Sequence, residues 1–264
     1  MKPHDIGCDD DLPSDLLHGR VVLVTGAGAG LGREVALACA AKGATVALLG
    51  RSPERLSATY DAITEAGGRE PAAIPLDLAS ATDRDFDTLA GLLRKDLGGL
   101  DAIVHCAVRF RNLSPVRDQS LDDWLAGLRV NLAAPQALTR ACLPLLEASA
   151  DGTVVFTSET HAVAPAAYWA ELAVPKAALA TLVAVWADEL GERGPRMHVI
   201  VPGPVASPQR GRSHPGEARA QLPPPQAVAR AYLRLLGPDG RACGIGPLAV
   251  VTDRTGKSAG NGLN

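Results

Sequence analysis

A glycine-rich segment with a regular spacing follows the first strongly apolar run of the chain, residues 21–25. The segment fits the pattern T-G-x-x-x-G-x-G, and a stretch of helical period begins directly after it. Glycines let a backbone turn with positive φ, and the free N–H groups at a helix N-terminus favour an anion such as a pyrophosphate. The residues expected to form this anion-binding loop are Thr25, Gly26, Gly28, Gly30, Leu31 and Gly32.

A planar cation stands after the next apolar run, residues 45–49. Gly50 is followed there by Arg51 and Ser52, and Pro53 is typical of a first helical position. Dinucleotide-binding sheets usually carry an acid at this place for the ribose 2′-hydroxyl of NAD, whereas an arginine accommodates the 2′-phosphate of NADP. A guanidinium beside a helix N-terminus also suits a phosphate dianion. Arg51 and Ser52 therefore favour NADP(H) over NAD(H), unless Arg51 is only a solvated loop residue.

Short apolar runs alternate with longer amphipathic segments along most of the chain. Runs that are hydrophobic almost throughout are typical of strands covered on both faces. The alternation predicts an α/β fold, a Rossmann-type doubly wound seven-stranded parallel sheet with helices on both faces. The expected strands are 20–25, 45–49, 72–75, 102–106, 153–157, 197–201 and 248–251, and the expected helices are 31–42, 53–66, 82–97, 120–147, 172–193 and 225–236.

The length and composition of the chain fit one domain with a sizeable core. The chain has 264 residues, of which 47% are hydrophobic, and α/β folds of this size usually form a single unit. We expect an acidic N-terminal tail over residues 1–18, one dinucleotide-binding domain over 19–253, and a flexible C-terminal tail over 254–264. Within the domain, residues 204–224 are rich in Pro, Arg and Gly and predict a lid over the substrate.

Several classes of protein are disfavoured by the composition. The net charge is −3 with acids and bases scattered, which argues against a nucleic-acid partner. The five cysteines show no CxxC spacing, which favours free thiols in a reducing cytoplasm over a disulfide frame or a metal site. No stretch approaches ~18–20 uninterrupted apolar residues, so we expect no membrane span.

These motifs, in this order, resemble the short-chain dehydrogenase/reductase family over about residues 19–252. The resemblance implies an NADP(H)-dependent oxidoreductase acting on a small carbonyl or alcohol substrate. The matched positions are Asp77 and Leu78 at the adenine, Ala107 in a turn where the family usually has Asn-Ala-Gly, Asn131 and Ser158 at the active site, Lys176 at the nicotinamide ribose, and Pro202 and Gly203 beneath the nicotinamide.

One position departs from the family pattern. The family pairs a tyrosine with a lysine four residues later, but Leu172 stands four residues before Lys176. Hydride transfer to a carbonyl carbon leaves an alkoxide that must be protonated, and a tyrosine beside an ammonium supplies that proton. Leucine cannot do so, and loss of general acid catalysis slows such a reaction by ~10²–10⁴-fold.

Three nearby side chains are candidate replacements for the missing acid. Tyr168 lies four residues before Leu172, while Glu159 and His161 come directly after the strand that ends in the serine. Pro175 suggests that the helix begins only shortly before the lysine, which would place Tyr168 in a loop. A phenol of the substrate or an ordered water is a further alternative, and each of the three side chains also has a purely structural explanation.

The sequence therefore predicts an NADP(H)-dependent ketone or quinone reductase, or an alcohol dehydrogenase, with an atypical proton donor. Two alternatives are a dinucleotide-binding fold reused for cyclisation, dehydration or isomerisation, and a catalytically inactive partner subunit. The segment 176–190 is apolar nearly all round, and in the family the helix that contains it and the one at 120–147 often join subunits. A homodimer or homotetramer is therefore expected.

Overall fold

The computed structural model describes residues 3–8, 12–244 and 246–251. Within them, eight parallel strands form one sheet in the order β1-β8-β7-β6-β5-β2-β3-β4. The expected C-terminal tail, residues 254–264, lies outside the described residues. The strands are β1 (His4–Gly7), β2 (Val21–Thr25), β3 (Thr45–Gly50), β4 (Ala72–Pro75), β5 (Ala102–His105), β6 (Thr153–Thr157), β7 (Arg196–Val201) and β8 (Pro247–Val251).

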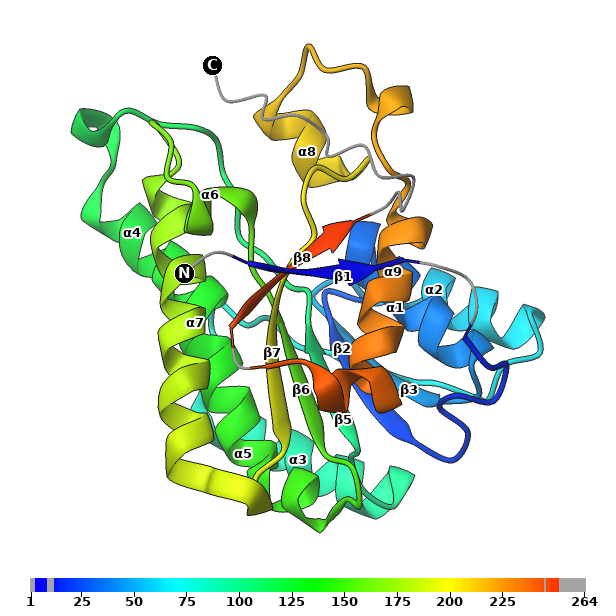
Figure 1. Cartoon of the computed structure of the whole chain (residues 1–264). Coiled ribbons are helices and arrows are strands. Elements are labelled where there is room, and N and C mark those ends of the chain that lie inside the picture. Colours follow the sequence, from blue (N-terminus) through cyan, green and yellow to red (C-terminus); the bar gives the residue numbers. More distant parts are fainter. Residues whose placement is uncertain (1–2, 9–11, 245, 252–264) are drawn as a thin grey trace.

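Helices cover both faces of this sheet (Figure 1). Helices α1, α2 and α9 bury their apolar sides on one face, and α3, α5 and α7 do so on the other. This arrangement confirms the predicted Rossmann-type α/β fold. The helices are α1 (Gly30–Ala41), α2 (Pro53–Glu65), α3 (Asp83–Leu97), α4 (Leu121–Leu128), α5 (Ala134–Ala148), α6 (Thr160–Val163), α7 (Ala170–Leu190), α8 (Pro208–Ser213) and α9 (Pro225–Leu236).

The expected count of seven strands is wrong by one. The additional strand is β1, which comes from the segment expected to be a tail and pairs in parallel with β8 at the edge of the sheet. Only Ile6 of its four residues is buried. A single buried residue leaves no apolar run, so the sequence gives little indication of this strand.

The start of helix α7 also differs from the expectation. The helix begins at Ala170, so Pro175 lies inside it rather than in its first turn. Proline removes one helical hydrogen bond at such a position. The apolar side chains before it hold the first turn in place, because Trp169, Leu172 and Ala173 are buried together. Tyr168 lies in the preceding loop, with a φ of 75°.

By length and composition alone, one segment of the described residues, Ala170–Arg193, could cross a membrane. Core helices pass the same test, and α7 packs here against β7, α4 and α6. Its packing inside the fold is that of a helix covering a sheet.

Candidate functional site

A cavity of about 1010 Å³ lies at the carboxyl ends of the strands. It extends from the loops after β2 and β3, past the residues after β4, to the loops after β5, β6 and β7. The order of the sheet reverses between β2 and β5, and ligands of doubly wound sheets bind at this place. The cavity is large enough for a dinucleotide together with a small substrate.

The glycine loop forms one end of this cavity. Gly26, Gly28, Gly30, Leu31 and Gly32 all line it. A Cβ added to Gly32 would lie 2.4 Å from the carbonyl oxygen of Gly26, so the turn closes only because this side chain is absent. The loop thereby brings its backbone N–H groups and the start of α1 to the cavity, as a pyrophosphate site requires.

Thr25 has a different role from the one expected. It is fully buried and is not among the lining residues. Its Oγ1 accepts a hydrogen bond of 3.1 Å from the backbone N–H of Ala107, which does line the cavity. Thr25 therefore ties the glycine loop to the turn after β5 rather than facing a ligand.

Polar side chains follow β3 and β4 at the same end of the cavity. Arg51 and Ser52 line it, and so do Asp77 and Leu78. Ser52 Oγ accepts from the backbone N–H of Arg55 at 3.3 Å and so caps α2. Its hydroxyl also donates to Glu54.

Arg55 is a lining residue that the sequence analysis missed. It lies one helical turn after Arg51, with its Cβ against Gly28. Neither arginine forms an ion pair with a described residue, so both guanidinium groups are available to an anion. The spacing of four residues between the two arginines, at the start of a predicted helix, is the sequence signal that could have identified Arg55.

Ser158 and Lys176 come together at the opposite end of the cavity. Lys176 is buried on α7, and its Nζ donates a hydrogen bond of 2.8 Å to the carbonyl oxygen of Thr157. Ser158 Oγ donates to the carbonyl oxygen of Lys176 at 3.2 Å. Burial lowers the pKa of the Lys176 ammonium to about 8. Both side chains line the cavity, as expected.

Asn131 is buried outside the cavity and positions a loop that lines it. It is fully buried in a π-helical turn, Arg129–Ala133, between α4 and α5. Its side-chain amide donates to the Arg109 carbonyl at 2.9 Å and accepts from the Arg109 N–H at 3.0 Å. Asn131 is not a lining residue, so in this structure it holds the loop after β5 in place.

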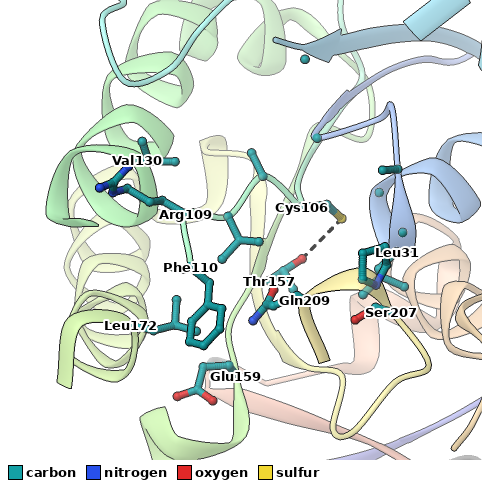
Figure 2. A pocket seen from close by; sticks show the side chains of 18 of the residues that line it. Leu31, Cys106, Arg109, Phe110, Val130, Thr157, Glu159, Leu172, Ser207 and Gln209 are labelled. Atoms are coloured by element: carbon teal, nitrogen blue, oxygen red, sulfur yellow. Dashed lines mark hydrogen bonds between the residues drawn. The ribbon is translucent and has the colours of Figure 1, made fainter. Parts of the chain in front are cut away.

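An apolar cluster surrounds Leu172, four residues before the lysine. Leu172 is only 2% exposed and packs with Phe110, Trp169 and Ala173. The Phe110 and Trp169 rings stack with centroids 5.8 Å apart. Figure 2 shows Phe110, Leu172 and Glu159 on one side of the cavity, with Leu31 and Ser207 on the other.

Two of the three candidate proton donors line the cavity, and one does not. Glu159 and His161 are lining residues, whereas Tyr168 is 57% exposed and is not among them. The His161 ring lies 4.3 Å from the Trp169 ring, and its Nδ1 lies 3.2 Å from the Ala164 carbonyl oxygen. Glu159 Oε1 is buried without a hydrogen-bond partner in the described part of the chain.

Cys106 is close to these groups but is not a reactive thiol. Its Sγ lies 3.5 Å from Thr157 Oγ1 (Figure 2). Burial raises the pKa of this thiol to about 11, so it stays protonated at neutral pH and is a poor nucleophile. Between residues 3 and 251, as far as they are described, no group of three His, Cys, Asp or Glu side chains could hold a metal ion.

Residues after β7 form part of the cavity wall, and some of them belong to the segment 204–224 that we expect to be a lid. Pro202 and Gly203 line it after β7, and α8 continues the same wall. A Cβ on Gly30 would lie 3.4 Å from Pro208, so the start of α8 rests against the glycine loop. Arg210 in α8 pairs with Glu217 at 2.5 Å and therefore does not offer a free charge to the cavity.

Known proteins that are similar to this chain are oxidoreductases. The family model for short chain dehydrogenase matches residues 20–218. The uncharacterized oxidoreductase YciK of Escherichia coli K12 is 37% identical over 86% of this chain and 90% of its own length. Glucose 1-dehydrogenase of Gluconobacter oxydans is 31% identical over 74% of this chain and 72% of its own length.

Solved structures show the same fold. A short chain dehydrogenase from Shigella flexneri in complex with NADP is 34% identical, has a TM-score of 0.85, and covers 90% of this chain and 99% of its own. One from Escherichia coli CFT073 in complex with NADPH is 35% identical, with a TM-score of 0.85 and the same coverage. The chain therefore belongs to the short-chain dehydrogenase family and is an oxidoreductase of that type.

Proposed function

We propose that this oxidoreductase uses NADP(H) to interconvert an apolar ketone or quinone and the corresponding alcohol. The observation that carries the proposal is a single cavity with an anion-binding loop and two free arginines at one end and the Ser158–Lys176 pair at the other. Solved structures similar to it include complexes with NADP and NADPH, which supports this cofactor.

The residues present fit such a cofactor. The turn at Gly32 leaves room for backbone only, so a pyrophosphate can approach the start of α1 closely. Arg51 and Arg55 would hold a 2′-phosphate, and Lys176 would donate to the nicotinamide ribose. When bound, the nicotinamide supplies or accepts the hydride.

The chain's own residues would prepare the carbonyl for that transfer. The Ser158 hydroxyl can turn from the Lys176 carbonyl to donate to the carbonyl oxygen of the substrate. Two of the three ammonium N–H groups of Lys176 remain for ligands after its bond to Thr157. The Asn131 amide keeps the loop after β5 in register with the site.

The walls around the reacting end favour an uncharged, apolar substrate. Phe110, Trp169 and Leu172 form this wall. The arginines beside this wall are engaged: Arg109 pairs with Asp123 at 3.6 Å and faces Glu171 at 3.9 Å, and the Arg212 guanidinium lies over the Phe110 ring, 5.9 Å from its centroid. Burying an unpaired charge against such a surface is costly, so a neutral carbonyl compound fits best.

The cofactor assignment predicts a preference that can be measured. We expect the chain to bind NADPH at least ~10-fold more tightly than NADH, and Arg51→Ala to weaken NADPH binding by ~10-fold or more, because a charge-assisted hydrogen bond contributes about 1.5–3 kcal/mol. NADH binding should not change in this variant. Titration followed by tryptophan fluorescence measures both constants, and equal affinity for the two cofactors would contradict the assignment.

We also propose a cytoplasmic homodimer or homotetramer joined through α4 and α7. Leu125 on α4 and Val174 and Val185 on α7 are large apolar side chains that are about half exposed. We expect Val185→Glu to lower the apparent mass in size-exclusion chromatography with light scattering, because a buried carboxylate disfavours an apolar interface. An unchanged mass would exclude this part of α7 from the interface.

A further inference from the structure

We propose that Glu159 donates the proton to the carbonyl oxygen during reduction, in place of the side chain at position 172. This inference rests on the proposed function, and it names the acid that the proposed function leaves open.

The position of Glu159 in the fold is well defined. It directly follows Ser158, whose backbone N–H donates to the Ile200 carbonyl at 2.7 Å. The next residue begins helix α6, so the carboxyl is held between the end of β6 and a helix start. Glu159 lines the same cavity as Ser158, Leu172 and Lys176. In Figure 2 its carboxyl lies on the side of Phe110 and Leu172.

The surroundings of this carboxyl favour its protonated form. Oε1 is buried and has no hydrogen-bond partner among the described residues, so nothing there stabilises a carboxylate on that atom. Burial raises the pKa of Glu159. The backbone N–H groups of His161 and Ala162 and the charges of His161 on α6 and Lys176 on α7 act in the opposite sense, and the effect of burial is the larger. A carboxyl kept neutral in this way carries an O–H that it can donate.

The other two candidates are less suited to the task. His161 Nδ1 lies 3.2 Å from the Ala164 carbonyl oxygen, which can only accept, so this nitrogen is already engaged and only Nε2 of the imidazolium is left to act as an acid. Tyr168 is exposed and outside the cavity. Leu172 has no proton to give and is buried with Phe110 and Trp169.

The proposed step balances without a further reactant. A hydride from C4 of the NADPH nicotinamide forms the new C–H bond at the carbonyl carbon, and the C=O π electrons move to oxygen. The Glu159 O–H bond breaks as the new O–H bond of the alcohol forms. The products are the alcohol, NADP⁺ and the Glu159 carboxylate, which takes up a proton from water before the next turnover.

Glu159→Gln tests the proposal, because glutamine keeps the size of the side chain but cannot lose a proton. We expect kcat for ketone reduction to fall by ~10²–10⁴-fold, while the Kd for NADPH stays within about 3-fold of that of the parent chain. Circular dichroism and NADPH binding show whether the variant is folded. In the parent chain the rate should fall as the pH rises through the raised pKa of Glu159, and this pH dependence should be lost in Glu159→Gln.

Glu171→Gln is the matched control. Glu171 also has a buried Oε1 without a hydrogen bond, although Arg109 Nε lies 3.9 Å from it, and burial raises its pKa, but it is not a lining residue of the cavity. Its replacement should leave kcat within about 3-fold. The double variant Glu159→Gln, Leu172→Tyr should regain at least ~10-fold of the lost rate, because a phenol one helical turn before Lys176 supplies a new acid.

The outcomes separate the two proposals. A parent chain that binds NADPH and turns over, together with a Glu159→Gln variant of unchanged kcat and pH profile, would overturn the role of Glu159 and leave the proposed function standing. A parent chain without turnover on a panel of ketones and quinones would overturn the proposed function and this inference with it. An equal loss in Glu171→Gln would show that the effect of Glu159→Gln is structural.

Discussion

Replacing Lys176 with methionine is expected to lower kcat/KM for carbonyl reduction by ~10²–10³-fold, the loss typical for removal of one buried donor at a reacting centre. The ammonium is buried, donates to the Thr157 carbonyl at 2.8 Å and lies beside Ser158, so no other described cation can take its place. Methionine has a similar length and an apolar character, so the fold should persist. Steady-state kinetics with NADPH and a ketone measure the effect.

The pH dependence gives a second readout of the same variant. Lys176 titrates at about 8 in the folded chain, below its ordinary value, so the activity that depends on the ammonium should decline as the pH rises through about 8. The free energy of unfolding should rise, not fall, as the pH rises through this range. The unfolded chain binds this proton more tightly, so stability rises from about pH 8 to about pH 10.5. Urea unfolding should show this rise in the parent chain but not in Lys176→Met.

Lys95 provides the control for a lost positive charge, because it is exposed on α3 and far from the cavity-lining set. Lys95→Met should keep both kcat/KM and its pH profile. If Lys176→Met retained more than about a third of the activity, the Ser158–Lys176 pair would not be the reacting end of the cavity.

Gly32→Ala should abolish NADPH binding in practice, with an affinity at least ~100-fold weaker, and should destabilise the fold by ~1–3 kcal/mol. The new Cβ would lie 2.4 Å from the Gly26 carbonyl oxygen and 3.1 Å from Cys106 Cβ. Both neighbours belong to segments held by strands, so relief of the clash must open the loop. Fluorescence titration and urea unfolding measure the two effects.

Gly91→Ala is the matched substitution for this prediction. Gly91 lies inside α3, and no atom lies within 4 Å of an added Cβ. The variant should be as stable as the parent chain or more stable by up to ~1 kcal/mol, because alanine favours a helix over glycine. Full affinity for NADPH in Gly32→Ala would mean that the close approach in the loop is not needed for the cofactor.

The fold follows from the sequence because parallel strands are buried on both faces. The run 153–157, of which only the last residue is not buried, is apolar enough to be recognised, and its observed bounds are the expected ones. The edge strand 72–75 also has the expected bounds, although none of its residues is buried. Strand β1 could not be predicted, because a single buried isoleucine makes no hydrophobic pattern. The start of α7 could not be predicted either, because the packing of Trp169 and Leu172 outweighs the local effect of Pro175. Packing between distant segments is not visible in a local sequence pattern.

The candidate site follows from the sequence in part. Residues next to strand ends, such as Gly30, Arg51 and Ser158, reach the cavity because the fold brings those ends together. Thr25 and Asn131 were expected at the cavity, yet the structure uses both to hold neighbouring backbone. The sequence also left open which of the three candidate side chains, Tyr168, Glu159 or His161, donates the proton. That choice depends on burial and on unmet hydrogen bonds, and both arise only when separate segments pack.

The short strand β1 has a consequence for handling the protein. An uncovered strand edge presents unpaired N–H and C=O groups on which a foreign chain can assemble. Residues 4–7 cover this margin of β8 and are themselves too few to offer a long template. A form shortened by residues 1–8 would keep every residue of the cavity and the buried Leu17 but expose β8. Its first defect would then be self-association in solution and not slower chemistry.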